Sequence, residues 1–155
     1  MNGEPLTIIL AEDDDGHAQL IHRNLQRAGL LNGFIRARDG QEALDLVRGE
    51  GEHPGPGLSG RCLLLLDINM PRVDGVEVLR RIKADPALAM TPVIMLTTTD
   101  DPREVDRCYS LGCNVYITKP VAYERFVEAI KQLGLFLQVV KVPETNGSSQ
   151  EKSRG

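Results

Sequence analysis

The sequence predicts a doubly wound α/β domain, in which helices cover both faces of a parallel β-sheet. Five short apolar runs of strand length alternate with stretches whose apolar residues recur at helical spacing. The runs lack the polar alternation of a half-exposed strand, as expected for parallel strands that are buried on both sides. With 155 residues, of which 41% are hydrophobic, the chain has the size of one compact domain.

The predicted strands are short, and three of them end abruptly at an acidic or hydroxyl side chain. These three are residues 6–11, 61–66 and 93–96. Two weaker apolar runs, residues 34–37 and 115–117, complete the set of five.

Five helices are predicted from apolar residues that share one helical face. The stripes are Ile21, Leu25 and Ala28; Ala43, Leu44 and Val47; Val78, Leu79 and Ile82; Val105, Cys108 and Tyr109; and Phe126, Ile130, Leu133 and Leu137. Gly29 is predicted to end the first helix, and Asp101, Pro102 and Glu104 have the pattern of a helix start. Strands that alternate with helices imply right-handed crossovers and a parallel sheet.

Two segments fall outside this scheme. Residues 49–60 are rich in Gly and Pro and predict a flexible surface loop. Residues 143–155 are polar and small, which predicts a disordered tail after a domain of residues 1–142. The end of the last helix is more apolar than a surface helix requires, which indicates either core packing or a self-association surface. The residues concerned are Leu135, Phe136, Leu137, Val139, Val140 and Val142.

Composition argues against several classes of protein. The formal net charge is -4 with no basic run, which disfavours nucleic-acid binding. No apolar run approaches the roughly 20 residues that span a bilayer, and no signal peptide precedes the first strand, so we expect an unexported protein without a membrane segment. The literal GxGxxG of residues 55–60 precedes a strand, whereas a dinucleotide loop follows one.

The cysteines and histidines do not have the spacing of a metal site. Cys62, Cys108 and Cys113 are odd in number and form no CxxC pair, so we expect reduced thiols, most of them in the core. His17, His22 and His53 lack a ligand pattern such as HExxH, and surface or helix-face roles are expected for them.

Polar residues follow four of the predicted strands. They are Glu12, Asp13, Asp67, Thr97 and Lys119. Taken singly, each is explained as well by a helix cap or a solvated loop, and Asp14, Asp15 and Asp74 are interpreted in that way. Together, however, the carboxyl ends of parallel strands bring these side chains to one crevice.

The chemistry of this set indicates phosphoryl transfer to an aspartate. Carboxylates about 4 Å apart repel by roughly 4 kcal/mol at an effective dielectric near 20, so they need a cation, and magnesium suits an all-oxygen set. Lys119 adds a fixed positive charge and Thr97 a hydroxyl donor. Asp67 is the predicted nucleophile because it lies centrally, between the other acids and the lysine.

These segments resemble the receiver family of two-component response regulators. The matching motifs are residues 9–14 (ILAEDD), 66–71 (LDINMP) with Asp74 and Gly75, 96–98 (LTT) and 118–120 (TKP). The resemblance implies a flavodoxin-like sheet of strand order 2-1-3-4-5, phosphorylation of Asp67 by a histidine kinase, and a conformational switch. It further implies magnesium ligation by Glu12, Asp13, Asp67 and the Asn69 carbonyl, readout through Thr97 and Tyr116, and an influence of Asn69 and Thr99 on hydrolysis.

A narrower resemblance is to the single-domain regulators that serve phytochrome-type kinases, and it rests on the long loop before the third predicted strand, residues 96–98 (LTT) and the extended C-terminus. It favours a homodimer formed through the C-terminal helix region, while the receiver resemblance implies a cytoplasmic protein that assists only its own phosphorylation and dephosphorylation. Three departures from the family pattern are Glu12 in place of Asp, the bulkier Thr98, and Val121 where Phe is frequent. Two alternatives remain open: a receiver that binds a partner without phosphorylation, and a flavin-dependent or nucleotide-dependent reductase of the same fold.

Overall fold

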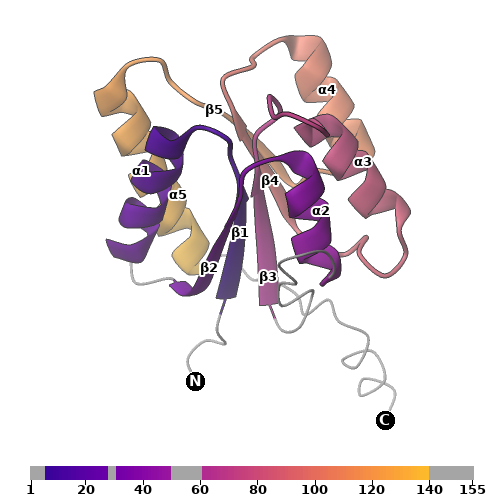
Figure 1. Ribbon diagram of the computed structural model, residues 1–155. Helices are drawn as coiled ribbons and strands as arrows, with labels where there is room; N and C mark the ends of the chain where they lie inside the picture. The colour runs from indigo at the N-terminus through magenta and orange to yellow at the C-terminus, as the bar shows by residue number, and fades with distance from the viewer. Residues whose placement is uncertain (1–5, 28–30, 50–60, 140–155) are drawn as a thin grey trace.

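The computed structural model describes residues 6–27, 31–49 and 61–139 (Figure 1). Strands and helices alternate along the chain. Their bounds are β1 (Leu6–Ala11), α1 (Asp15–Arg27), β2 (Leu31–Ala37), α2 (Gly40–Arg48), β3 (Arg61–Leu66), α3 (Gly75–Ala84), β4 (Val93–Thr97), α4 (Pro102–Leu111), β5 (Val115–Thr118) and α5 (Tyr123–Val139).

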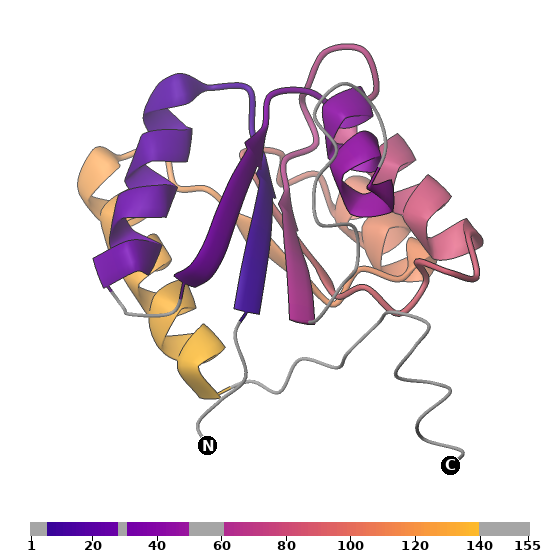
Figure 2. The ribbon, with the colours of Figure 1, turned by 60° about the horizontal axis from the view of Figure 1, so that its bottom comes forward.

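The strands form one parallel sheet in the order β2-β1-β3-β4-β5. Helices α1 and α5 cover one face, and α2, α3 and α4 cover the other (Figures 1 and 2). The predicted doubly wound α/β fold and the strand order 2-1-3-4-5 are therefore confirmed. Reversal of strand order beside β1 puts a crevice at the carboxyl ends of β1 and β3.

The core lies on both sides of the sheet because the central strands β1 and β3 carry apolar residues toward both faces. Alternate residues of β1 and β3 face opposite layers: Ile9 and Leu64 pack with α2 and α3, whereas Ile8 and Leu65 pack with α1 and α5. All three cysteines are buried, as predicted. The predicted buried stripes of the second, third and fifth helices are confirmed.

The fourth helix differs from its prediction. Cys108 is buried and Val105 is half-buried, but the predicted core residue Tyr109 is 47% exposed. The ring lies at the edge of the sheet, and its hydroxyl accepts a hydrogen bond from the Tyr116 N–H at 3.0 Å. Tyr109 therefore satisfies a backbone donor of the edge strand β5, a role that apolar periodicity does not reveal.

The apolar end of α5 contributes both to the core and to the exposed surface, the two possibilities that the sequence left open. Leu137 is buried, whereas Leu135 and Phe136 are 56% and 44% exposed.

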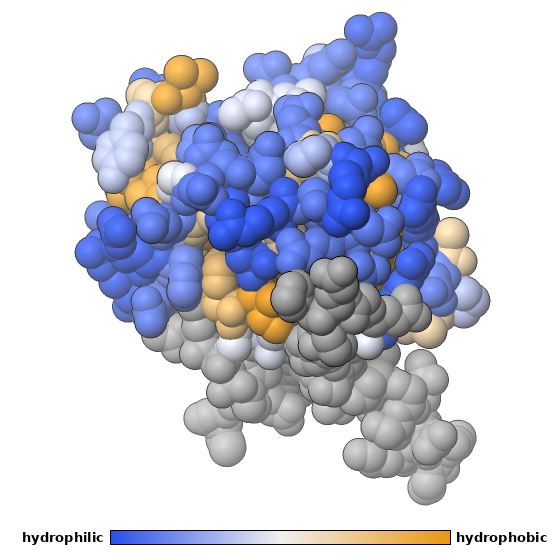
Figure 3. All heavy atoms as spheres, viewed as in Figure 1, coloured by the Kyte–Doolittle hydropathy of each residue, from blue (hydrophilic) through white to orange (hydrophobic). Residues whose placement is uncertain are grey.

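The space-filling view of Figure 3 is mainly hydrophilic, with hydrophobic residues near the loop between β5 and α5. Val121 and Tyr123, the exposed apolar residues of that region, are 99% and 65% exposed.

Several predictions lie outside the described residues or are only partly covered. Ala28 and Gly29, most of the 49–60 loop and the tail from residue 143 are outside them. Gly49 is described: it ends α2 with a left-handed φ of 75°. Among the described residues, no helix has the length and apolarity needed to cross a membrane.

Candidate functional site

Three carboxylates meet at the carboxyl ends of β1 and β3. Glu12 and Asp13 follow β1, Asp67 follows β3, and one oxygen from each lies within 4.8 Å of the others. Glu12 is 1% and Asp67 7% exposed, whereas Asp13 is exposed. Buried carboxylates at this separation repel one another, so the cluster requires positive charge.

Lys119 supplies part of that charge from beyond β5. The ammonium is buried, with 3% exposure of the residue, and it donates to Glu12 Oε1 at 2.5 Å and to Asp67 Oδ2 at 3.1 Å. Burial raises the pKa of Glu12 to about 7, against the lowering effect of its hydrogen bond with Lys119. One ammonium does not balance three carboxylates, so an all-oxygen cluster with excess negative charge remains, which is the donor set that magnesium prefers.

The loop after β3 holds Asp67 tightly against the start of α3. Gly75 N–H donates to the Ile68 carbonyl at 2.8 Å, and a Cβ on Gly75 would lie 2.0 Å from the Asp67 carbonyl oxygen. The loop also contains Arg72, a non-glycine residue at a φ of 69°, whose guanidinium makes two 3.0 Å contacts with Asp39 at the start of α2. The Asp67 N–H also donates to the Ala11 carbonyl at 3.1 Å, so β1 on one side and the start of α3 on the other fix the Asp67 backbone.

Arg36 is a site residue that the sequence analysis missed. Its Nε and Nη2 donate to the Glu12 carbonyl at 2.9 and 2.8 Å, and Nη1 pairs with Asp15 at 2.6 Å. Arg36 therefore holds the turn that carries Glu12 and Asp13. The available signal was the one charged residue in the otherwise apolar run of residues 34–37.

The predicted cap residues have mixed outcomes. Asp14 accepts from the His17 N–H at 2.9 Å, and Asp74 accepts from the Glu77 N–H at 2.9 Å, so both cap helix starts as predicted. Asp15 instead lies in the first turn of α1 and pairs with Arg36.

The predicted switch and hydrolysis residues form a hydrogen-bonded layer beside the acids. Asn69 Nδ2 donates to Thr99 Oγ1 at 3.3 Å, and Thr99 N–H donates to Thr97 Oγ1 at 3.4 Å. The Tyr116 hydroxyl donates to the Thr99 carbonyl at 2.6 Å. Thr97 is fully buried at the end of β4, and burial raises the pKa of Tyr116 to about 12. The loop after β4 is consequently tied to both β3 and β5.

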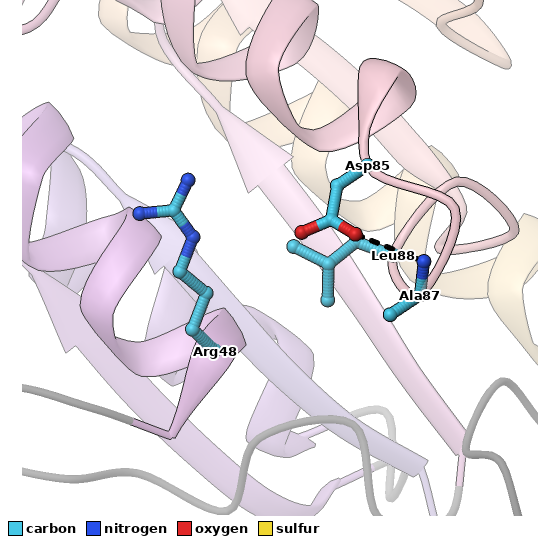
Figure 4. A pocket seen from close by; sticks show the side chains of 4 residues that line it. All are labelled: Arg48, Asp85, Ala87 and Leu88. Atoms are coloured by element: carbon cyan, nitrogen blue, oxygen red, sulfur yellow. Dashed lines mark hydrogen bonds between the residues drawn. The ribbon is translucent and has the colours of Figure 1, made fainter.

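A hollow of about 350 Å³ lies at the other end of the molecule, beside the C-terminal ends of α2 and α3 (Figure 4). Arg48, Asp85, Ala87 and Leu88 line it. The Asp85 carboxylate accepts a hydrogen bond from the Ala87 N–H at 2.9 Å. This hollow is remote from the acidic cluster, so it does not contribute to the candidate site.

The crevice geometry agrees with the family comparison. Residues 8–131 match the sequence profile of the response regulator receiver domain. The chain belongs to this receiver family. Receiver domains are signalling proteins, and the resemblance in the motifs is confirmed.

Relatives with solved structures share the fold. A response regulator receiver domain from Rhodospirillum rubrum is 51% identical, with a TM-score of 0.83 over 91% of this chain and 99% of that one. The phosphorylated cyanobacterial phytochrome response regulator RcpA is 33% identical, with a TM-score of 0.82 over 90% and 99% of the two chains.

A third relative, response regulator Rcp1 of Synechocystis, is 33% identical over 90% of this chain and 94% of its own length. The Mn²⁺-bound form of Rcp1 has a TM-score of 0.82 over 90% of this chain and 99% of that one. The receiver is therefore similar to phytochrome response regulators, as the narrower resemblance predicted.

Proposed function

We propose that this receiver is a single-domain response regulator whose Asp67 accepts a phosphoryl group from a histidine kinase in a magnesium-dependent reaction. The observation that carries the proposal is the meeting of Glu12, Asp13 and Asp67 within 4.8 Å, with the Lys119 ammonium 3.1 Å from Asp67. The Mn²⁺-bound state of Rcp1 supports a divalent ion as the cofactor.

Several residues of the chain would take part in the phosphoryl transfer, each with its own role. The Asp67 carboxylate attacks phosphorus, a P–O bond forms, and the bond from phosphorus to the donor imidazole breaks, with the electron pair leaving on the imidazole nitrogen. Lys119 is placed to donate to a phosphoryl oxygen from beside Asp67. Magnesium, held by Glu12, Asp13, Asp67 and the Asn69 carbonyl, would neutralise charge on the transferring group.

The proposed switch uses the layer that contains Thr97 and Tyr116. A phosphoryl group adds nearly two negative charges, which gives the Thr97 hydroxyl an acceptor stronger than its present neighbours. Thr97 then shifts the loop after β4, and the Tyr116 bond to the Thr99 carbonyl couples that shift to β5. The surface built from α4, β5 and α5 would change its shape, and it would signal through protein contacts rather than through nucleic acid or a membrane.

The proposed partner is a sensor histidine kinase, and the similarity to RcpA and Rcp1 supports a phytochrome-type kinase. A cytoplasmic location and a receiver of residues 1–142 belong to the same proposal. Exposed Leu135 and Phe136 on α5 support a homodimer through the C-terminal helix region. The protein would catalyse no reaction beyond its own phosphorylation and dephosphorylation.

A receiver that binds its partner without phosphorylation is the second candidate, favoured by Thr98 beside the site and by the exposed apolar residues of α5. Intact-mass analysis with acetyl phosphate separates the two. We expect one phosphoryl group on the protein with magnesium, none with a chelator, and none on Asp67→Asn. Asp106→Asn, a matched change at an exposed acid of α4, should be modified normally. If Asp67→Asn is modified to the wild-type level, Asp67 is not the phosphoacceptor. If the wild type is not modified, the receiver that binds its partner without phosphorylation is favoured.

A further inference from the structure

We propose that His17 is a positioning residue for Lys119: its imidazole Nδ1 accepts the third hydrogen bond of the ammonium and holds it beside Asp67. This inference rests on the proposed function for its effect on phosphoryl transfer. The hydrogen bond itself does not depend on that function.

The donors of Lys119 are fully used. A lysine ammonium has three N–H donors and no acceptor. Nζ lies 2.5 Å from Glu12 Oε1, 3.1 Å from Asp67 Oδ2 and 3.1 Å from His17 Nδ1. Because the ammonium only donates, His17 Nδ1 must be the acceptor, and the imidazole proton lies on Nε2.

Contacts with two helices hold His17 in place, one through its backbone and one through its ring. Its backbone N–H donates to Asp14 Oδ1 at 2.9 Å in the first turn of α1. The ring meets Phe126 of α5 edge to face, with centroids 5.0 Å apart and planes at 75°. Phe126 is buried in the core, so the acceptor for Lys119 is held at the junction of α1 and α5.

A neutral acceptor suits this place for an electrostatic reason. Lys119 has a flexible four-carbon stem, and two carboxylates attract its ammonium at once. A third carboxylate would orient the ammonium but would also repel an incoming phosphoryl group. The imidazole orients the ammonium without adding negative charge, so the N–H that now donates to Asp67 can turn to a phosphoryl oxygen while Glu12 and His17 keep the other two.

The first test is a pair of substitutions that differ in the acceptor. Asparagine carries Oδ1 on the same carbon position as histidine Nδ1, so His17→Asn keeps an acceptor, whereas His17→Leu keeps bulk and removes it. His22→Leu is the control, because His22 lies on the same helix but stacks on Phe34 at 4.0 Å. We expect acetyl phosphate with magnesium to modify His17→Leu about tenfold more slowly than wild type, an effect of about 1.4 kcal/mol for one hydrogen bond to a charged group. His17→Asn and His22→Leu should stay within about twofold of wild type on the same scale.

The second test needs no phosphorylation. At a pH of about 8, where an ordinary imidazole is neutral, the ¹⁵N spectrum of the unmodified protein should show His17 with its proton on Nε2 and an unprotonated Nδ1. A proton on Nδ1 would overturn the inference whether or not Asp67 is a phosphoacceptor. If wild type and His17→Leu are modified at equal rates, the positioning role is rejected while the proposed function stands. If wild type is not modified at all, the proposed function fails and the spectrum still decides the hydrogen bond.

Discussion

The Lys119 ammonium lies 3.1 Å from Asp67 Oδ2, although 52 residues separate the two in sequence. Both side chains are buried, and the same ammonium contacts Glu12. The fold therefore holds a cation between two acids that come from different strands. This arrangement ties the stability of the domain to the charge of its proposed reaction site.

Lys119→Met should destabilise the metal-free protein. The substitution leaves Glu12 and Asp67 buried without their cation, and breaking such a pair costs on the order of 3 kcal/mol. Urea unfolding followed by circular dichroism in the presence of a chelator measures the loss. Added magnesium should restore part of the lost stability, since a bound cation replaces the missing charge. Lys131→Met, at an exposed position of α5, is the control, and equal stability of Lys119→Met and wild type would contradict the prediction.

Gly75→Ala should disrupt the loop that carries Asp67. The added methyl group would lie 2.0 Å from the Asp67 carbonyl oxygen, so the backbone must move. We expect a loss of about 2 kcal/mol or more in unfolding free energy and slower modification by acetyl phosphate. Gly16→Ala in α1 is the comparison, because its nearest neighbour is the movable Asp14 side chain at 3.3 Å. Similar behaviour of the two variants would show that the close approach at Gly75 has no consequence.

Arg72→Gln should make the stability of the protein less sensitive to acid. Burial acts to raise the pKa of Asp39, but hydrogen bonds from Arg72 and the Glu42 N–H outweigh it and lower the pKa below 3.8. A depressed carboxyl pKa contributes stability above the unfolded pKa, and this contribution is lost as pH falls through the folded value. Wild type should therefore be more stable than Arg72→Gln at neutral pH, and the difference should shrink below about pH 3.8.

Unfolding curves of the two proteins at neutral and acid pH measure this convergence. Arg23→Gln, on the exposed face of α1, controls for the loss of one positive charge. A difference that stays constant as the pH falls would indicate that the Arg72 contact with Asp39 acts through packing alone.

Leu135→Glu and Phe136→Glu should weaken the proposed homodimer without unfolding the monomer. Both side chains are exposed, so charge is introduced at little cost to the core. Size-exclusion chromatography at several concentrations should show a higher dissociation constant for each variant than for wild type. Met90→Glu, a change at another exposed apolar residue, is expected to leave assembly unchanged. A wild type that stays monomeric at all concentrations would rule out the proposed homodimer.

The sheet and the acidic cluster were predictable because they depend on local patterns. Apolar runs without alternation, such as residues 61–66, identify buried parallel strands, and the residues that follow such strands must meet at one edge. The positions of Glu12, Asp13, Asp67 and Lys119 follow from that rule.

The contacts that hold the cluster in place could not be predicted in the same way. Arg36 of β2 donates to the Glu12 carbonyl at the end of the neighbouring strand. His17, in the first turn of α1, contacts Lys119 beyond β5. Neither belongs to a spacing motif, because each contact depends on side-chain direction across elements. The prediction that Tyr109 is buried was wrong for a related reason. Periodicity places Tyr109 on the apolar face of its helix, but its hydroxyl accepts a hydrogen bond from the backbone of β5.

Chemical trapping of the acyl phosphate shows whether Asp67 itself carries the phosphoryl group. Borohydride reduction of protein treated with acetyl phosphate and magnesium converts an aspartyl phosphate to homoserine, which peptide mapping locates. We expect homoserine at position 67 alone, and none when magnesium is withheld. Homoserine at Asp13, Asp14 or another acid, with Asp67 unchanged, would contradict it.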